Sequence, residues 1–587
     1  MRYLSKYRSK YGNRFCLAVL LVACEAAVDL LQPAMLALII DEGIAERDIS
    51  GVIRLGGIML LLTAGGALAA AGRNIIASQV SQNFGSELRY DLFRHIQTLS
   101  FGLIDRFDRA SLVTRLTNDV TQVQNFVNGM MRIFVKAPLL CIGSLIMAVN
   151  LNPQLAVVLV IVVPIVGGII ALNMKMGFPR FMRVQQAMDL LSSTMREYLS
   201  GIRVVKAFGR SNYESAKFNS SNEHYQEEAA AAVRAMAVFN PVITLTVNLG
   251  IAAVIWISGM RINGGQMPVG QTVAFVNYMT QILFSLMMIS FVLNMYVRAK
   301  ASSGRIREVF AAENEMTWDE DAAEQMEGRG HISFDNVSFS YAGQSGEPIL
   351  RGIQLSCKPG ETIGLIGSTG SGKTSLVQLI PRFYDTSSGM VRVNGVDVRK
   401  LNPAILRERV AIVPQKTVLF SGTIRANIRW GNEEAGDEEV EHAAQLAAAH
   451  AFIQDFPSGY DTRIGQDGVN LSGGQKQRIS IARALLRKPE ILILDDCTSA
   501  VDASTEAAIK ESLRSYASDL TCILIAQRIT SVMDADQIIV LEDGEVAGIG
   551  SHKELLQECN VYREIYRSQL GKEELAHEAG GRQPIGG

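Results

Sequence analysis

The sequence contains Gly367-Ser368-Thr369-Gly370-Ser371-Gly372-Lys373-Thr374, a stretch that fits the pattern G-x-x-x-x-G-K-[ST] of a phosphate-binding loop. A strand-like run over residues 361–366 precedes it and a helix-like run from Ser375 to Ile380 follows it, as such a loop requires. The glycines let backbone N–H groups turn inward around phosphate oxygens, Lys373 adds a positive charge, and Thr374 offers a hydroxyl to Mg²⁺. The stretch therefore predicts a binding site for ATP and Mg²⁺, formed by residues Gly367 to Ser375.

Length and composition indicate a membrane protein with more than one domain. The chain has 587 residues, too many for a single core. Hydrophobic residues make up 48% of it and charged residues only 19%, which favours a membrane protein. The net charge of −2 gives no sign of a nucleic-acid partner. The seven cysteines never fall at C-x-x-C spacing, so we interpret them as reduced packing residues.

Six apolar runs are each close to the length that spans a bilayer; they cover about residues 15–40, 54–78, 127–149, 154–173, 237–259 and 271–297. Residues 1–14 carry five basic residues with aromatic residues between them, which predicts a short helix on the cytoplasmic membrane surface. The positive-inside rule places this end in the cytoplasm, and six crossings return the second half of the chain to the same side. We expect a multi-pass protein of the plasma membrane, in a bacterium.

The connections between the spans alternate in length. Those near 79–126 and 174–236 are long, polar and rich in helix-forming residues, so they are predicted to extend as helices into the cytoplasm. Two segments within them combine an aromatic residue or glycine with charged helical flanks, namely 101–120 and 197–208. On pattern alone they could be ordinary tips of helical hairpins or short helices that contact the second half of the chain.

Several charged residues interrupt the apolar spans. Glu25 and Asp29 lie four residues apart in the first span, so they are predicted to share one helix face, and Arg132 and Lys136 do the same in the third span. Arg73 ends the second span. Charges in hydrocarbon are costly, so they should face one another or a water-filled interior. They could line a substrate pathway, or they could form structural ion pairs and snorkel toward the span ends.

The sixth span is rich in flexible and aromatic side chains that suit varied apolar ligands. Simple packing within a helix bundle is the alternative explanation for them. The residues are Phe275, Met279, Phe284, Met287, Met288, Phe291 and Met295. We select Met287, Met288 and Phe291, with Glu25 and Asp29, as candidate substrate-pathway residues.

The second half carries further motifs in a fixed order. Residues 491–495 read as a buried parallel strand that ends in Asp495, a carboxylate placed to hold Mg²⁺. About 20 residues earlier stands Leu471-Ser472-Gly473-Gly474-Gln475, directly before a helical run. This stretch resembles the signature loop of the ATP-binding cassette (ABC) family, and the resemblance covers the whole chain.

The resemblance implies roles for individual residues. Tyr341 resembles the aromatic residue that stacks on adenine, Gln415 resembles the residue that senses Mg²⁺ and the γ-phosphate, and Ser499-Ala500-Val501-Asp502 resembles the loop that crosses the dimer. In this family two ATPase domains enclose two ATP molecules, each held by one chain's phosphate-binding loop and the other chain's signature loop. Ser472 and the N–H groups of its helix would then cap the γ-phosphate.

Six spans ahead of the ATPase resemble the exporter branch, and such a half-transporter must pair with a second one. The implied fold is an α-helical six-span membrane domain with long cytoplasmic extensions, of the type I exporter kind, fused to an α/β ABC ATPase domain. The expected domains are residues 1–305 for the membrane part, 306–329 for a linker, 330–570 for the ATPase and 571–587 for a disordered tail. The segments within 101–120 and 197–208 then map onto the family's two coupling helices.

Three positions depart from the family pattern. Asp496 stands where the family has the glutamate that acts as general base, and Gln527 stands where it has the switch histidine. Aspartate is one methylene shorter, and a displacement of about 1 Å can cost about a hundredfold in rate, while glutamine cannot take up a proton as histidine can. Gln466 also replaces a glutamate that is usual in exporters.

These departures, beside an intact signature loop, predict a slow, degenerate nucleotide site on this chain. A non-identical partner with the usual glutamate and histidine would supply the catalytic residues of a second, fast site. We expect an ATP-driven exporter subunit for hydrophobic or amphipathic compounds, of the multidrug type. The alternatives are a lipid or peptide exporter, an ATP-gated regulator or channel, and a homodimer with two slow sites.

Overall fold

The computed structural model describes the chain except for residue 1 and residues 313–315, 317–327, 342–345, 498–500, 517–518 and 570–587. Most of the predicted linker and all of the predicted tail lie outside the described residues. The chain divides into two compact units. Unit 1 comprises Met1–Thr98 and Phe107–Ala312, and unit 2 comprises Leu99–Arg106 and Glu313–Gly587.

Unit 1 is helical, and six stretches of it are long and apolar enough to cross a membrane, as the sequence predicts. These candidate spans are Ser9–Ile44, Ile49–Thr98, Arg109–Leu151, Pro153–Ser200, Ser211–Asn263 and Val269–Phe310. Its helices are α1 (Arg2–Leu38), α2 (Ile49–Thr98), α4 (Arg109–Thr114), α5 (Val120–Gly129), α6 (Lys136–Leu151), α7 (Pro153–Ser200), α8 (Ile202–Ala207), α9 (Ser211–Ala237), α10 (Phe239–Asn263) and α11 (Val269–Phe310). Three short π-helical stretches interrupt them: η1 (Ile39–Ile44), η2 (Arg115–Asp119) and η3 (Met130–Phe134).

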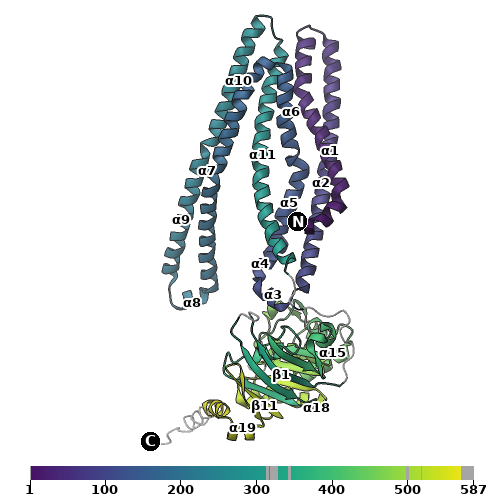
Figure 1. The fold of residues 1–587 in the computed structure, drawn as a ribbon, viewed down its shortest axis with the longest axis vertical. Helices are drawn as coiled ribbons and strands as arrows, with labels where there is room; N and C mark the ends of the chain where they lie inside the picture. Colours follow the sequence, from purple (N-terminus) through teal and green to yellow (C-terminus); the bar gives the residue numbers. More distant parts are fainter. Residues whose placement is uncertain are drawn as a thin grey trace. The chain divides into compact units, whose positions relative to one another are not determined.

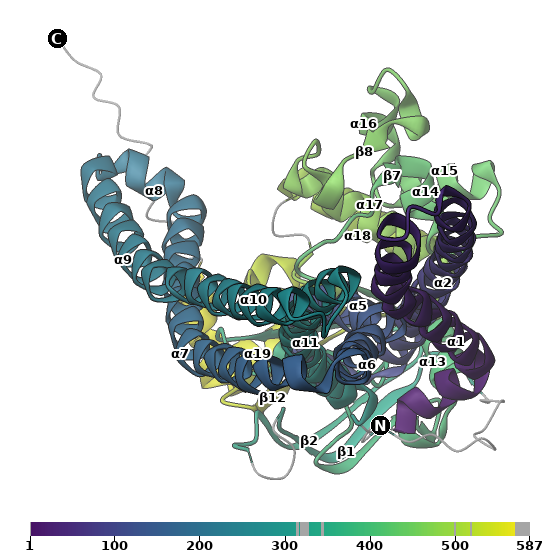
Figure 2. The same ribbon diagram turned by 90° about the horizontal axis from the view of Figure 1, so that it is seen from above.

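The helices of unit 1 form two groups that are joined at one end. One group holds α7 beside α9 and α10, which follow one another end to end. The other holds α1, α2, α5, α6 and α11, and α5, α6 and α11 lie between α7 and the pair α1 and α2 (Figures 1 and 2). The connection from α6 to α7 is tight because Asn152 caps α7 and Pro153 begins it. Large apolar side chains such as Leu61, Leu68 and Trp256 remain more than 70% exposed, as expected of helices that face lipid or a partner.

A π-helical turn changes the expected alignment in the third span. Arg132 lies within η3, whereas Lys136 begins α6. A π-helix has a wider turn than an α-helix, so residues four apart no longer align as they do in an α-helix. Lys136 is half-buried and pairs with acidic groups, while Arg132 is exposed. The prediction that these two residues share one helix face is therefore wrong.

Unit 2 is built around a six-stranded sheet with the strand order β12-β11-β3-β10-β9-β6. Neighbours from β11 to β6 are parallel, and β12 adds an antiparallel edge. The strands are β3 (Thr362–Gly367), β6 (Val410–Val413), β9 (Ile491–Asp495), β10 (Thr521–Ile525), β11 (Gln537–Glu542) and β12 (Glu545–Gly550). All five residues of β9 are buried, as its continuous apolar run predicts.

A four-stranded antiparallel sheet with the order β2-β1-β4-β5 accompanies it, and β7 and β8 form a small third sheet. These strands are β1 (Ile332–Phe339), β2 (Leu350–Cys357), β4 (Ser388–Val393), β5 (Val396–Asp397), β7 (Gly422–Thr423) and β8 (Arg463–Ile464). Alternate residues of β9 belong to two different cores: Leu492 and Leu494 to one, Ile491 and Ile493 to the other. The six-stranded sheet is thus covered on both faces.

Most helices of unit 2 connect these strands, whereas α3 lies between α2 and α4 in the chain and α19 follows the last strand; α15, α18 and α19 are labelled in Figure 1. They are α3 (Phe101–Arg106), α12 (Lys373–Gln378), α13 (Pro403–Arg409), α14 (Ile424–Arg429), α15 (Asp437–Leu446), α16 (His450–Gln454), α17 (Gly473–Leu486), α18 (Ala503–Tyr516) and α19 (His552–Glu558), with further helix over 560–569. Helix α11 continues to Phe310, past the boundary at 305 that the sequence suggests.

Candidate nucleotide-binding site

The phosphate-binding loop joins the end of β3 to the start of α12. Two of its residues, Gly370 and Gly372, have φ angles of +88° and +94°, in the region that favours glycine. A Cβ atom on Gly372 would lie 2.7 Å from Leu350 Cδ2, so a side chain there would be both strained and crowded. The backbone of the loop is therefore fixed by glycine at the turn into α12.

The polar side chains of this loop fit a polyphosphate. Lys373 Nζ donates hydrogen bonds to the carbonyls of Gly367 (2.8 Å) and Ser368 (2.7 Å), so the ammonium group lies over the loop. Burial lowers the pKa of Lys373, although Asp495 and Asp496 oppose this shift. Ser371 is buried, and within the described residues its Oγ has no hydrogen-bond partner. A buried hydroxyl of this kind calls for a hydrogen-bond partner, and a phosphate oxygen would supply one.

Thr374 and Asp495 bring two oxygen ligands together beside the loop. Thr374 Oγ1 donates to Asp495 Oδ1 over 3.3 Å. Burial raises the pKa of Asp495, and the neighbouring Asp496 carboxylate adds to the shift. A hydroxyl and a carboxylate are ligands that Mg²⁺ prefers, so this pair fits the metal role that the sequence predicts.

Two glutamine side chains converge on Asp496. Gln415 Nε2 donates to Asp496 Oδ2 over 3.0 Å, and Gln527 Nε2 donates to the same oxygen over 2.8 Å. Three of the four residues predicted to act in hydrolysis, from three separate segments, therefore meet at one oxygen, whereas the fourth, Asp502, does not. Asp496 also has a φ of +46°, a left-handed conformation that aspartate tolerates better than most side chains.

Sequence reasoning missed Gln569, which holds the segment that carries Gln527. Its Nε2 donates to the Gln527 carbonyl over 2.8 Å, and its Oε1 accepts from the Ile529 N–H over 2.7 Å. These two bonds tie the helical stretch 560–569 to the chain that follows β10. No motif marks Gln569 in the sequence, because its partners are backbone groups about 40 residues away.

The signature loop forms the start of α17. Ser472 Oγ accepts from the Gln475 N–H over 3.3 Å, and Gln475 Oε1 accepts from the Ser472 N–H over 2.9 Å, which together form a capping box. Leu471 is buried, while Gly473 and Gly474 open the helix. Gln466 lies in a 3-10 turn just before this loop.

Asp502 and Tyr341 occupy different places around these loops. At the start of α18, Asp502 accepts from the Thr505 N–H (3.0 Å) and Thr505 Oγ1 (2.8 Å). A hydrogen bond from the Ser504 hydroxyl, and then those from Thr505, lower the pKa of Asp502. Ser499 and Ala500 lie outside the described residues. Tyr341 is half exposed, and its OH lies 3.0 Å from Ser375 Oγ beside the phosphate-binding loop.

Comparisons with known proteins agree with this geometry. Residues 15–287 match the family described as "ABC transporter transmembrane region", and residues 350–499 match "ABC transporter". An uncharacterized ABC transporter ATP-binding protein of Bacillus subtilis, YfiB, is 41% identical over 95% of this chain and 96% of its own. The chain belongs to the ABC transporter family.

Other relatives and a solved structure extend this result. A protein of Mycobacterium tuberculosis, Rv1273c, is 37% identical over 96% of this chain and 97% of its own. A putative multidrug export ATP-binding/permease protein of Bacillus subtilis, YgaD, is 35% identical over 82% of this chain and 83% of its own. The structure of a bacterial Atm1-family ABC exporter with ATP bound has a TM-score of 0.79 and 26% identity, over 95% of this chain and 98% of that one.

The chain is thus an ABC exporter half-transporter: a multi-pass membrane domain fused to an ATPase domain that drives transport. Half-transporters of this family generally dimerise.

Within unit 2 of this ABC chain, α3 packs on the ATPase core. Tyr384 OH donates to Asp105 Oδ2 over 2.6 Å, and the rings of Phe101 and Phe383 are 4.6 Å apart.

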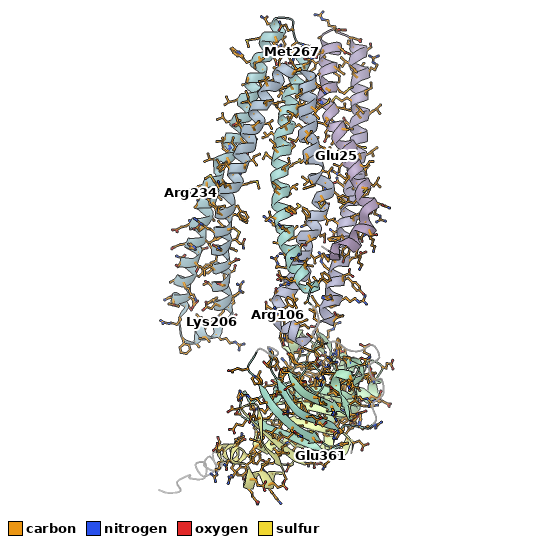
Figure 3. All side chains as sticks on the ribbon, viewed as in Figure 1. Glu25, Arg106, Lys206, Arg234, Met267 and Glu361 are labelled. Atoms are coloured by element: carbon orange, nitrogen blue, oxygen red, sulfur yellow. The ribbon has the colours of Figure 1, made fainter. Side chains whose placement is uncertain are left out.

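Four of the five charged residues that the sequence singles out in the spans of this ABC chain pair with one another. Glu25 Oε2 lies 2.7 Å from Arg73 Nη1, and its Oε1 lies 2.6 Å from Lys136 Nζ. Lys136 also lies 2.9 Å from Asp29. Glu25 and Arg73 are buried, and Figure 3 shows Glu25 part-way along the helices of unit 1. The two acidic and two basic groups form a neutral network that joins α1, α2 and α6.

Six of the seven aromatic and methionine side chains that the sequence singles out in α11 divide into two sets, and the seventh, Met295, is half-buried. Phe275 and Met279 are buried in the core that α11 shares with α6, α7 and α10, so they serve packing. The other set is exposed and includes all three α11 residues selected as substrate-pathway candidates. Its members are Phe284, Met287, Met288 and Phe291.

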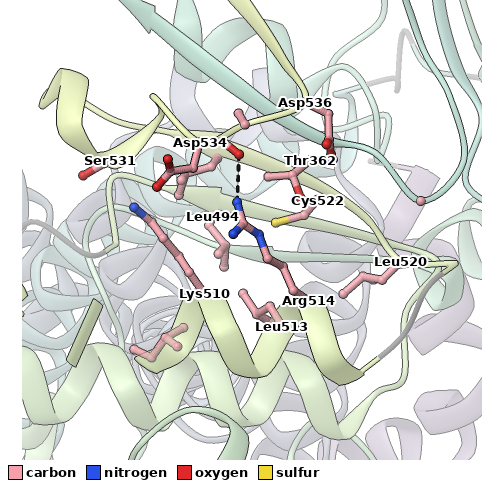
Figure 4. Close-up of a pocket in the computed structure, with 14 residues that line it drawn as sticks. Thr362, Leu494, Lys510, Leu513, Arg514, Leu520, Cys522, Ser531, Asp534 and Asp536 are labelled. Atoms are coloured by element: carbon pink, nitrogen blue, oxygen red, sulfur yellow. Dashed lines mark hydrogen bonds between the residues drawn. The ribbon is translucent and has the colours of Figure 1, made fainter. Parts of the chain in front are cut away.

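A separate cavity of about 240 Å³ lies in the ATPase domain (Figure 4). It lies between α18 and the first residues of β3 and β10, where Arg514 donates to the Asp534 carbonyl over 2.8 Å. Thr362 at its wall begins the strand whose other end is the phosphate-binding loop. The cavity is therefore distinct from the nucleotide site.

Proposed function

We propose that this chain is the degenerate-site subunit of a heterodimeric exporter that uses ATP and Mg²⁺. One observation carries the proposal: the carboxylate in the position of the general base, Asp496, is held by two amide groups, from Gln415 and Gln527. A general base must reach the attacking water with a free lone pair. Asp496 is one methylene short of the family's glutamate, and one of its oxygens already accepts two hydrogen bonds.

Gln527 strengthens this proposal because its side chain donates to Asp496 and has no titratable group. A histidine in this position can bind or release a proton near neutral pH, and glutamine cannot. The remaining parts of the site retain their function: Lys373, Ser371 and the loop glycines would bind the phosphates, and Thr374 with Asp495 would hold Mg²⁺. The site would therefore bind ATP and hydrolyse it slowly.

The signature loop supports a second, fast site that is completed by a partner. Ser472 caps α17 with its side chain, and the N–H groups at the start of a 14-residue helix are suited to an anion. This loop has none of the departures seen at Asp496 and Gln527. A non-identical half-transporter with the usual glutamate and histidine would place its own phosphates against this loop.

The proposed cargo is a hydrophobic or amphipathic compound moved out of the cytoplasm or inner leaflet. Exposed Met287, Met288 and Phe291 on α11 offer an adaptable apolar surface, and the resemblance to YgaD, named as a putative multidrug export protein, supports the same class. Short helices α3 and α8 would act as coupling helices. The chain would lie in a bacterial plasma membrane with its ATPase in the cytoplasm.

The deciding experiment measures ATP hydrolysis by this chain alone and after co-expression with candidate half-transporters. We expect low activity alone and high activity with the true partner, lost when the partner's catalytic glutamate is removed. High activity of this chain alone would contradict the degenerate site. Uptake of a hydrophobic dye into inverted vesicles, blocked by vanadate, distinguishes the exporter from an ATP-gated regulator or channel.

A further inference from the structure

One charge inside the spans of unit 1 is left unbalanced. The network of Glu25, Asp29, Arg73 and Lys136 contains two acidic and two basic groups, so it is neutral as a whole. Arg132 is exposed, and no hydrogen bond or ion pair joins it to another described residue. Because an unpaired charge is costly in hydrocarbon, this arginine should face water or an anion.

Arg132 lies within the apolar part of the third span and not at its end. The apolar run begins near Val127, and the five residues from there to Arg132 rise roughly 7–8 Å along the helix axis. The apolar runs of the fourth, fifth and sixth spans contain no Asp, Glu, Lys or Arg, and Arg54 stands at the first residue of the second run. Arg132 is therefore the one charge more than a turn inside these runs that the described network does not balance.

The contacts of the third span place Arg132 beside α11. A Cβ atom on Gly129 would lie 2.6 Å from Met295 Sδ, so the end of α5 packs closely on α11 at this level. The third and sixth spans cross in opposite directions, so Arg132, in the turn after Gly129, stands level with Phe291, in the turn before Met295. Both spans are central in unit 1, between α7 and the pair α1 and α2 (Figures 1 and 2).

At this level α11 carries an exposed apolar stripe, which includes the three residues selected from this helix as substrate-pathway candidates. Its members are Phe284, Met287, Met288 and Phe291. Their spacing of three and four residues places them on one face of α11, and Met295, which packs beside α5, continues that face. The stripe extends over seven residues, roughly 10 Å along the helix. Arg132 stands level with one end of it.

A second polar group near Arg132 lacks a partner. The Oδ1 atom of Asn128, four residues before Arg132, is buried and has no hydrogen-bond partner among the described residues. Leaving a buried amide group unsatisfied is costly. The amide can also turn to offer its N–H groups in place of Oδ1. Arg132 and Asn128, one turn apart, can thus donate hydrogen bonds to the same anionic group.

We propose that the cargo of this exporter is an amphipathic organic anion, with an apolar body of about 10 Å and one carboxylate or sulfonate at its end. The stripe on α11 would bind the apolar body, a task to which flexible methionine side chains are suited. Arg132 would pair with the anionic group through its fork of N–H groups, and Asn128 would add a donor. The inference rests on the proposed export of hydrophobic or amphipathic compounds, and it adds the charge of the cargo.

The test compares three pyrene compounds that differ mainly in charge: 1-pyrenebutyrate, 1-pyrenebutanol and 1-pyrenebutylamine. Each is titrated into the purified full-length protein, in the complex it forms, and the shift of the thermal midpoint with ligand concentration gives an apparent affinity. Arg132→Gln should weaken pyrenebutyrate about tenfold or more, the scale of one lost charge-assisted hydrogen bond, and should leave pyrenebutanol unchanged within about twofold. Arg132→Lys keeps the charge and should retain part of the preference for pyrenebutyrate.

Two further variants separate the charge from the apolar surface. Phe291→Ala should weaken all three compounds alike, because it removes apolar contact and no charge. Arg54→Gln is the matched control for Arg132→Gln, because Arg54 is an exposed cation at the opposite end of the spans. It should leave all three affinities unchanged. The thermal midpoint of each variant without ligand checks that folding is intact.

A preference for pyrenebutyrate that is lost in Arg132→Gln and kept in Arg54→Gln supports the anion site. Equal affinities for the three compounds in the unaltered protein, or equal behaviour of these two variants, overturn it. The readout needs no ATP hydrolysis, so it is independent of the test of export. ATP-driven uptake of pyrenebutanol without a preference for pyrenebutyrate would remove the anion site and leave the exporter. Binding of pyrenebutyrate that depends on Arg132, without ATP-driven uptake, would support the site and contradict export.

Discussion

Gln527 Nε2 lies 2.8 Å from Asp496 Oδ2 and donates a hydrogen bond to it, although the two residues stand on separate strand ends. The same oxygen accepts from Gln415 over 3.0 Å. An amide donor can hold this carboxylate but cannot exchange a proton with it or with water. Gln415 and Gln527 therefore hold the Asp496 side chain in place, but neither can exchange a proton as a histidine could.

The first prediction concerns this pair. Asp496→Glu combined with Gln527→His should raise single-turnover hydrolysis at this site by about ten- to a hundredfold, because the longer acid restores reach of about 1 Å. Asp496→Glu alone should gain less, because Gln527 still stands where the histidine contact would be. Adding Lys373→Ala should remove the gain if it arises at this phosphate-binding loop. Unchanged turnover in the double variant would contradict the degenerate-site proposal.

The identity of this pair could be read from the sequence, whereas its geometry could not. Asp496 and Gln527 stand at fixed positions after two motifs, so their departure from the family pattern is visible in the residues alone. The shared hydrogen bonds depend on β9 and β10 lying side by side in the sheet, with Ile525 opposite Asp495. Strand order is a long-range property that local pattern does not encode.

The contacts of Gln569 are also long-range and could not be predicted from local sequence. They provide the second prediction. Gln569→Ala removes two hydrogen bonds to the backbone around Gln527, each worth about 0.5–1.5 kcal/mol. We expect faster amide hydrogen exchange at Ile529, measured by mass spectrometry of the peptide that contains it. Gln569→Glu keeps the acceptor for Ile529 and should show a smaller change.

A matched control for this experiment is Gln557→Ala, which alters an exposed glutamine on α19. It should leave exchange at Ile529 as in the unaltered protein. If Gln569→Ala and Gln557→Ala exchange alike, the contact does not hold this segment in solution.

The third prediction uses the raised pKa of Asp495, which follows from its burial and from Asp496. An acid whose pKa is raised in the folded state destabilises the fold once it ionises, so stability falls as pH rises from its ordinary pKa, about 3.9, through the raised value. Asp495→Asn should therefore raise the thermal midpoint at pH 7.5, and by progressively less as the pH is lowered toward the ordinary pKa of about 3.9. The same variant should lose the stabilisation that Mg²⁺ and ATP provide.

Asp534→Asn, at an exposed aspartate of the same unit, should change the midpoint little across this pH range. A midpoint for Asp495→Asn at or below that of the unaltered protein at pH 7.5 would show that the buried charge is not the cause. Scanning fluorimetry without nucleotide measures both variants.

The membrane charges were ambiguous in the sequence for a physical reason. Spacing shows that Glu25 and Asp29 share a helix face, but it does not show what the face contacts. Packing of α1 against α2 and α6 supplies the missing partners, Arg73 and Lys136. The π-helical turn at η3, which separates Arg132 from Lys136, has no clear sequence signal.

The fourth prediction follows from that network. Glu25→Gln should lower the thermal midpoint markedly, because it leaves Arg73 buried and unpaired, and breaking one partner of a buried pair costs about 3–5 kcal/mol. Asp29→Asn should cost less, because Lys136 still pairs with Glu25 and the Asp29 side chain is 31% exposed. Adding Arg73→Met to Glu25→Gln should recover part of the loss, since no unpaired charge then remains at that contact. If this double variant is stable but substrate no longer stimulates its hydrolysis, the network belongs to the substrate pathway; if stimulation persists, its role is structural.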